Sequence, residues 1–271
     1  MITLSSDFGW PYPAAMRGVV LRRTDARLVD VTHDFPRQDV RAAAFWLREV
    51  LPYFPPAVHV VVVDPGVGTD RAALAVRAGE HVLVGPDNGV LLPPARELAA
   101  VDDSATDDGT GVEVFDIEYG DPDSVTFHGR DVFAPVGAEI HEAGRATFEN
   151  ETDRETFETA DRFTPIEDYV DLSFPDPDVG DDAISGEVLV VDGFGNAITN
   201  VPGAVLADHY GGELAVDGES VPVARTYAAV EPGQHLLTVG SHGNVELAVN
   251  RGRGDSVFGV GPGDAVEIRR G

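Results

Sequence analysis

Acidic side chains with a glycine close behind follow two apolar runs of this chain. Asp64 comes directly after four consecutive valines, Val60–Val63, and a Pro-Gly-Val-Gly turn follows it. Asp7 comes shortly after the apolar run Ile2–Leu4. A carboxylate in such a place can accept a proton, and a glycine-rich turn lets the backbone approach a ligand closely. Arg71, seven residues after Asp64, is near enough along the chain to fold back onto it.

Each of these features has a simpler interpretation. Asp64 and Arg71 could close a tight turn with a surface ion pair, which contributes little stability. A ligand role is favoured by position, because ligands of open α/β sheets bind beyond the carboxyl ends of the strands. His128 precedes a helical pattern, where free N–H groups favour anions, and is either a catalytic or a capping residue. His33 closes a strand and is more often an edge residue than a ligand.

Strand patterns and helix patterns alternate in the first half of the chain. This alternation indicates an α/β domain with a largely parallel sheet. Besides the valine run, strands are expected at Ile2–Leu4, Leu28–His33, Leu74–Val76 and His81–Val84, and helices at Pro11–Leu21, Asp39–Leu51 and Val132–Ile140.

The second half has short strand patterns separated by glycine-rich turns, which is typical of a small β-barrel. We therefore expect an N-terminal α/β domain over 1–160, an acidic connection over 161–183 and a C-terminal β-barrel domain over 184–271. Residues 102–109 are expected to form a solvated acidic loop. The barrel strands are expected at Glu187–Val191, Glu213–Val216, Val221–Val223, Leu236–Val239, Val245–Val249 and Ala265–Ile268.

The charge balance excludes several classes of partner. The formal net charge is -28, and all 19 basic residues are arginines. Such a chain is unsuited to binding nucleic acid or an anionic membrane. There is no cysteine for disulfides or thiolate chemistry, no apolar run of membrane-spanning length, and no N-terminal signal pattern, so we expect a cytoplasmic protein. An acidic composition without lysine is typical of a salt-loving organism.

Seven motifs, in this order, resemble those of one family. They are Ser6-Asp7-Phe8-Gly9, Asp30-Val31-Thr32-His33, Asp64 to Arg71, Gly85 to Gly89, Phe127 to Asp131, Phe194-Gly195-Asn196 and Ser241-His242-Gly243. The chain resembles the S-adenosylmethionine hydrolases, also called hydroxide adenosyltransferases, which are homologous to the bacterial fluorinase and chlorinase. The resemblance extends over nearly the whole chain.

The resemblance implies a reaction and an assembly. The expected reaction is the hydrolysis of S-adenosyl-L-methionine to adenosine and L-methionine, without a metal or an added cofactor. The expected assembly is a homotrimer with its sites at subunit interfaces. By the family pattern Asp64, Arg71 and His128 orient and activate the attacking water. The halide-using relatives carry tyrosine at the position of Asp64, and the fluorinase has threonine at that of Val67.

The resemblance also implies residues that bind the substrate. His242 stands where the fluorinase uses an arginine near the methionine carboxylate. The expected contacts are Asp7 to the ribose hydroxyls, Asn196, Phe194 and Tyr227 to adenine, Asp192 to the methionine ammonium, and Ser241, with Glu246 nearby, to the methionine carboxylate; Asp64 also faces the substrate.

Three alternatives remain open at this point. Halide-dependent adenosyl transfer is disfavoured by Asp64 and Val67, because a carboxylate repels a halide. A non-catalytic protein that binds nucleosides or S-adenosylmethionine would need no residues that activate water. A metal hydrolase built on Asp7, His33, Asp64 and His128 is disfavoured, because the chain has no close ligand motif such as H-E-x-x-H.

Overall fold

The computed structural model describes residues 1–101, 111–120, 122–145 and 162–270. The chain divides into two compact units, Met1–Ser173 and Phe174–Gly271. The acidic loop expected at 102–109 lies outside the described residues. No helix within the described ranges combines the length and the apolar character needed to cross a bilayer.

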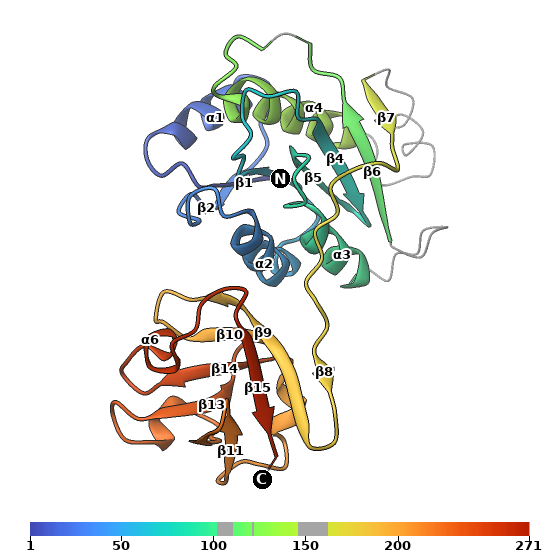
Figure 1. The fold of residues 1–271 in the computed structure, drawn as a ribbon. Coiled ribbons are helices and arrows are strands. Elements are labelled where there is room, and N and C mark those ends of the chain that lie inside the picture. Colours follow the sequence, from blue (N-terminus) through green and yellow to red (C-terminus); the bar gives the residue numbers. More distant parts are fainter. Residues whose placement is uncertain (102–110, 121, 146–161, 271) are drawn as a thin grey trace. The chain divides into compact units, whose positions relative to one another are not determined.

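The first unit is built on a seven-stranded sheet with the strand order β2-β1-β3-β5-β4-β6-β7 (Figure 1). The valine run forms β3, and all of its residues are buried, as expected for a strand covered on both faces. The strands are β1 (Ile2–Ser6), β2 (Leu28–Thr32), β3 (Val58–Val62), β4 (Ala73–Ala78), β5 (His81–Pro86), β6 (Val112–Ile117) and β7 (Phe163–Pro165).

The expectation of a largely parallel sheet holds for only part of this sheet. Strands β2, β1, β3 and β5 run parallel, whereas β4, β6 and β7 pair with their neighbours in antiparallel fashion. The reason is the connection between β4 and β5, which consists of Gly79 and Glu80 alone. Gly79 has a φ of 57°, and a connection this short can join only antiparallel strands, because parallel pairs need a long crossover.

Helices cover both faces of the sheet (Figure 1). On one face lie α1 (Tyr12–Leu21), the π-helical turn η2 (Gly129–Phe133) and α4 (Ala134–Arg145). On the other lie α2 (Val40–Val50), the short η1 (Leu51–Tyr53) and α3 (Leu92–Val101). The expected helices at Pro11–Leu21, Asp39–Leu51 and Val132–Ile140 are thus confirmed within a few residues.

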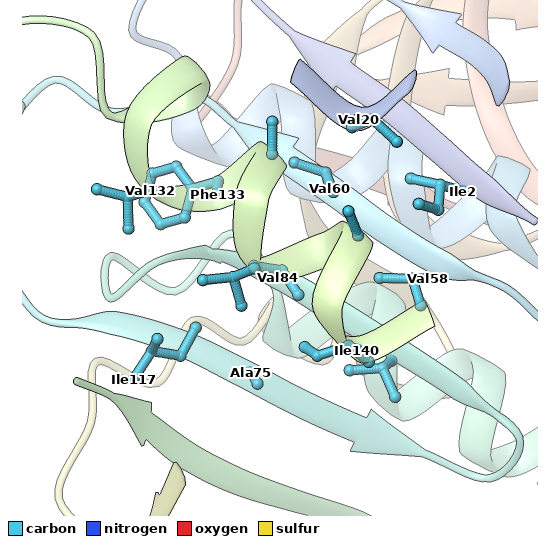
Figure 2. Close-up of a cluster of buried hydrophobic side chains, with 14 of the residues drawn as sticks. Ile2, Val20, Val58, Val60, Ala75, Val84, Ile117, Val132, Phe133 and Ile140 are labelled. Atoms are coloured by element: carbon cyan, nitrogen blue, oxygen red, sulfur yellow. The ribbon is translucent and has the colours of Figure 1, made fainter. Parts of the chain in front are cut away.

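The core between α4 and the sheet is packed with aliphatic side chains. Figure 2 shows Val58 and Val60 of β3 and Ile2 of β1 in one cluster with Phe133 and Ile140. The packing is close, because a Cβ added at Gly137 of α4 would lie 2.5 Å from Val60 Cγ2. Burial of this kind contributes about 25 cal/mol for each Å² of apolar surface removed from water.

The parallel strands end at one edge of the sheet. Ser6 of β1 lies beside Val62 of β3, so Asp7 and Asp64 follow at neighbouring places on that edge. His33 follows β2, which pairs with the other side of β1. This carboxyl edge is where ligands of open α/β sheets bind.

The second unit is an antiparallel sheet that curls into a nearly closed barrel (Figure 1). The strand order is β12-β11-β15-β9-β10-β14-β13, with β8 paired to β9. A bridge between Val223 and Leu237 connects the chain after β12 to β13, and the Ala224 N–H donates to the Leu237 carbonyl at 3.0 Å. The two ends of the sheet therefore meet, which confirms the expected β-barrel.

The barrel strands follow the expected positions, with two additions, β8 and β10, of which β8 lies in the stretch expected to be an acidic connection. Strand β10 was not expected, because its segment carries polar Thr199 and Asn200 and ends in Pro202. The elements are β8 (Asp178–Val179), β9 (Ala183–Val191), β10 (Ala197–Pro202), η3 (Gly203–Leu206), β11 (Glu213–Val216), β12 (Glu219–Pro222), η4 (Tyr227–Ala229), β13 (His235–Val239), β14 (Asn244–Val249), α6 (Gly254–Phe258) and β15 (Ala265–Arg269).

A pair of histidines is buried in the N-terminal sheet. His59 Nε2 lies 2.9 Å from His81 Nδ1, and His59 Nδ1 lies 2.8 Å from Thr3 Oγ1. The two rings stack with their centroids 5.2 Å apart. Burial, followed by the nearby His81 and the chain's amino terminus, lowers the pKa of His59 to about 3.

Acidification is therefore expected to destabilise the fold through His59. The unfolded chain binds a proton at His59 below about pH 6.5, whereas the folded chain does so only near pH 3. Stability is lost as the pH falls through this window, by on the order of 5 kcal/mol in full. Denaturant titrations between pH 4 and pH 7 measure the unfolding free energy. His59→Gln is the control, and an equally steep pH dependence in this variant would contradict the assignment.

Candidate active site

The Asp64 carboxylate lies just beyond β3 and is held from two sides. Its Oδ1 accepts hydrogen bonds from Arg71 Nη1 and from the Gly66 N–H, both at 3.0 Å. The Asp64 side chain is 6% exposed and that of Arg71 is 28% exposed. Among the residues that the structure describes, none bonds to Asp64 Oδ2. One oxygen is thus anchored and the other is available as an acceptor.

Gly66 gives Arg71 the space to reach Asp64. A Cβ added at Gly66 would lie 2.5 Å from Arg71 Nη2 and 2.6 Å from its Cζ. Any side chain here would have to displace the guanidinium. Residue 66 is therefore a glycine because the Arg71 guanidinium occupies the space that a side chain would need.

The turn after Asp64 also lies against the chain that leads to His128. Gly68 has a φ of 82°, and a Cβ there would lie 3.0 Å from the Val125 carbonyl oxygen. His128 is 8% exposed and sits at the start of η2, as the sequence predicts. Its ring centroid lies 6.0 Å from that of Tyr119.

Asp7 belongs to the same edge of the sheet. It is 9% exposed, and its Oδ2 accepts a hydrogen bond from the Gln38 N–H at 2.7 Å. The next residue, Phe8, packs edge-on against Phe127 with ring centroids 5.7 Å apart. Because Phe127 directly precedes His128, the chain segments that carry Asp7, Asp64 and His128 converge in the first unit.

A second group of candidate residues lies in the barrel unit, in the turn after β9. Asp192 Oδ1 accepts hydrogen bonds from the Phe194 N–H at 2.9 Å and the Asn196 N–H at 2.8 Å. Asp192 Oδ2 accepts one from Asn196 Nδ2 at 3.0 Å. Asp192 therefore shapes the turn and orients the Asn196 amide. Phe194 projects from it and is 81% exposed.

A chain of hydrogen bonds continues from Asn196 into the β13–β14 hairpin. Asn196 Nδ2 lies 3.4 Å from the Tyr227 hydroxyl, which donates to Glu246 Oε2 at 2.5 Å. His242 Nε2 lies 3.1 Å from Glu246 Oε1. The Asn244 N–H donates to His242 Nδ1 at 3.2 Å, so the proton of a neutral ring lies on Nε2 and points at Glu246.

These contacts keep the Tyr227 hydroxyl protonated. Burial, the hydrogen bond to Glu246, and the charges of Glu246 and Asp192 all raise the pKa of Tyr227 above its ordinary range. Glu246 is 4% exposed and has a donor on each oxygen. Both of its oxygens are therefore hydrogen-bonded within the barrel. Ser241 lies exposed at the tip of the same hairpin.

The structure thus brings the expected site residues into two groups. Asp7, Asp64, Arg71 and His128 lie in the first unit, and Asp192, Phe194, Asn196, Tyr227, Ser241 and Glu246 lie in the second. His242, which stands where the fluorinase has an arginine, was not assigned a contact of its own, and the structure pairs it with Glu246. Within the described parts of the chain, no three histidine, aspartate or glutamate side chains gather as metal ligands would.

Two family models match the chain in succession. The SAM hydroxide adenosyltransferase N-terminal domain matches residues 2–150, and the C-terminal domain of the same family matches residues 186–267. The chain belongs to the SAM hydroxide adenosyltransferase family. The two matches fall on the α/β unit and on the barrel unit.

Curated relatives carry one name. A protein of Salinispora arenicola is 40% identical over 100% of this chain and 98% of its own length, and is named (R)-S-adenosyl-L-methionine hydrolase. A protein of Thermus thermophilus with the same name is 38% identical over 97% of both chains. These relatives extend the family assignment over the whole chain.

The fold is also that of a solved structure. An uncharacterized conserved protein from Thermotoga maritima is 32% identical, with a TM-score of 0.80 over 100% of both chains. A conserved hypothetical protein from Thermus thermophilus gives a TM-score of 0.71 at 34% identity, over 99% of this chain and 98% of its own. The fold of this chain is therefore shared with these two solved structures.

Proposed function

We propose that this protein hydrolyses S-adenosyl-L-methionine to adenosine and L-methionine. The oxygen of water attacks C5′ of the ribose, the C5′–S bond breaks, and its electron pair stays on sulfur as neutral methionine forms. The water loses one proton to the protein or solvent. Since the substrate is a sulfonium, methionine is a good leaving group, and holding water in line can supply roughly 7–11 kcal/mol.

One observation carries this proposal. The Asp64 carboxylate ends a buried strand with Oδ1 anchored by Arg71 and Gly66, which leaves Oδ2 to accept from water. The chain belongs to the SAM hydroxide adenosyltransferase family, and its curated relatives are named as hydrolases of this substrate. In the proposed mechanism Asp64 orients the water, Arg71 holds Asp64, and His128 completes the group that activates the water.

The remaining residues hold the substrate. We assign the ribose hydroxyls to Asp7, whose Oδ1 has no partner among the described residues. In the barrel unit Glu246 is buried and has donors on both oxygens, so we assign it the task of holding Tyr227 rather than a ligand, whereas Asp192 is partly exposed and its carboxylate can still meet an ammonium group. The other assignments are adenine to Asn196, Phe194 and Tyr227, the methionine ammonium to Asp192, and the methionine carboxylate to Ser241.

Incubation with S-adenosyl-L-methionine tests the function directly. Adenosine and methionine in equal amounts are expected from reactions in sulfate buffer and equally from reactions with added chloride. A 5′-chlorinated nucleoside that forms only with chloride would instead support halide-dependent transfer. Calorimetric binding of the substrate without any product would support a non-catalytic binding protein.

We further propose a homotrimer with sites shared between subunits. The support is that substrate-binding candidates occur in both units, Asp7 in one and Asn196 in the other. Asp7→Ala and Asn196→Ala chains are each expected to be poorly active alone and to regain activity when mixed, dissociated and reassembled, because some sites then combine two intact halves. Mass spectrometry verifies the mixed assembly. A verified mixed trimer without recovery would place each site within one chain.

Salt dependence follows from the charge. With a net charge of -28 and no lysine, repulsion between carboxylates opposes compaction and assembly at low salt. At 1 M salt this repulsion is screened within about 3 Å. We expect melting temperature and trimer content to rise from 0.1 M to 2 M potassium chloride. Equal melting midpoints at the two concentrations would count against salt adaptation.

A further inference from the structure

His33, at the end of β2, contacts the chain on both sides of Asp7. Its ring Nδ1 lies 2.8 Å from Ser6 Oγ, the residue before Asp7. Its carbonyl oxygen accepts a hydrogen bond from the Gly9 N–H at 2.8 Å, two residues after Asp7. Asp7 is therefore bracketed by two hydrogen bonds to a single residue.

The Asp30 carboxylate lies behind the His33 ring. His33 Nε2 is 3.3 Å from Asp30 Oδ1, near enough for electrostatic attraction but without the geometry of a hydrogen bond, and Asp30 Oδ2 forms an ion pair with Arg17 Nη1 of α1 at 2.8 Å. The carboxylate favours a proton on Nε2, so that Nδ1 of the neutral ring accepts from the Ser6 hydroxyl. Ser6 is fully buried and the His33 side chain is 16% exposed. The ring thus has little freedom to turn.

The segment after His33 also holds the Asp7 carboxylate. The Gln38 N–H bonds to Asp7 Oδ2 at 2.7 Å, and Gln38 has a φ of 61°, which is uncommon for a residue other than glycine. Backbone strain of this kind is retained where the surroundings enforce it, often at functional sites. The chain from His33 to Gln38 therefore fixes one carboxylate oxygen and leaves the other to a ligand.

We propose that His33 is a positioning residue that aims the Asp7 carboxylate at the ribose hydroxyls of the substrate. This proposal rests on the proposed function of Asp7. His33 contacts no substrate atom in this scheme and acts through Ser6 and the backbone at Gly9. The competing role is purely structural: His33 would close the strand end and stabilise the fold without affecting the carboxylate.

A double-mutant cycle separates the two roles. The full-length parent, His33→Ala, Asp7→Ala and the double variant are compared by kcat/KM for S-adenosyl-L-methionine, with His209→Ala of the barrel unit as the control. His33→Ala is expected to lower kcat/KM about tenfold in the parent and less than about twofold in the Asp7→Ala background. The second loss is smaller because His33 acts through the Asp7 carboxylate, which is already missing there. Equal losses in both backgrounds would overturn the proposal.

Conservative variants sharpen the test. His33→Asn places an amide near the position of Nδ1 and is expected to recover at least half of the loss in kcat/KM on a logarithmic scale. His33→Gln reaches toward Asp30 instead and is expected to recover less. The reverse order would overturn the role of the Ser6 contact. If His33→Ala fails to fold, Ser6→Ala replaces it in the cycle with the same expected coupling.

Failure of the proposed function gives a different result. A parent that releases no adenosine refutes the hydrolase assignment. The same cycle is then measured as the calorimetric Kd of adenosine, which carries the hydroxyls assigned to Asp7. Coupling between His33 and Asp7 in that Kd supports positioning without catalysis, and absence of coupling or of adenosine binding overturns the proposal.

Discussion

Asp64→Asn is expected to release adenosine at least about a hundredfold more slowly than the parent, the scale on which removal of one polar group at a reacting centre commonly acts. The asparagine Oδ1 can still accept from Arg71 and Gly66 in the place of the anchored carboxylate oxygen. Its NH₂ group then replaces the free Oδ2, so a donor faces the water where the parent has an acceptor. His128→Ala is expected to cause a loss of similar size.

The measurement is adenosine release in the steady state beside calorimetric binding of S-adenosyl-L-methionine. Binding is expected to change far less than turnover, because the ribose, adenine and methionine contacts are assigned elsewhere. Asp70→Asn is the matched control, since Asp70 lies exposed in the same loop. If Asp64→Asn works near the parent rate, Asp64 only closes a turn and the proposed mechanism is wrong.

Gly66→Ala tests the contact between Asp64 and Arg71 without changing either charged residue. The added methyl group would lie 2.5 Å from Arg71 Nη2, and the guanidinium can move aside at little cost because it ends a flexible side chain. We therefore expect lower turnover with nearly unchanged unfolding free energy. Unchanged turnover would mean that the contact between Arg71 and Asp64 does not support catalysis.

Asp192→Asn is expected to weaken binding of S-adenosyl-L-methionine by about 10–100-fold, since hydrogen bonds to charged groups are worth about 1.5–3 kcal/mol. Asp192 Oδ2 accepts a hydrogen bond from Asn196 Nδ2. In Asp192→Asn an NH₂ group takes the place of this oxygen, so two N–H donors face each other. Asn196 must then rotate its amide and present the opposite polarity to a ligand. The turn itself survives, because the new Oδ1 still accepts from the backbone N–H groups of Phe194 and Asn196.

Calorimetry gives the affinity, and adenosine release at saturating substrate gives kcat. The expected pattern is a raised Kd and KM with a kcat within about threefold of the parent. The lost interactions stabilise the bound substrate and the transition state equally, so the barrier between them does not change. The matched control is Asp208→Asn, which changes an exposed carboxylate of the same unit. A large fall in kcat with an unchanged Kd would assign Asp192 to the chemical step instead.

Local sequence was sufficient for the elements that position the first group. The valine run predicts a buried strand, and Asp64 must follow it at the sheet edge. The helix from Ala134, with His128 just before η2, also follows from apolar spacing. These features depend on side-chain periodicity over fewer than about 15 residues, which a chain displays without its tertiary structure.

The pairing of strands was decided by tertiary structure. Strand β4 reads as one more strand of an alternating pattern, yet it lies outside β5 and runs antiparallel to it. Strand β10 has no clear apolar alternation, and it forms because β9 and β14 flank it in the barrel. A strand with partners on both sides is stabilised by hydrogen bonds that its own sequence does not reveal.

The contacts within the site were likewise beyond the reach of the sequence. The register that places Ile198 opposite Glu246 brings Asn196 toward Tyr227, and Tyr227 bonds to Glu246 across 19 residues of chain. The bond between Ser6 and His33 depends in the same way on the pairing of β1 with β2. Residue types and local patterns are enough to tell which chemical groups this protein carries and on which strand ends they stand. Which of those groups bond to one another depends on register and loop closure between distant segments, and these are set only when the chain folds.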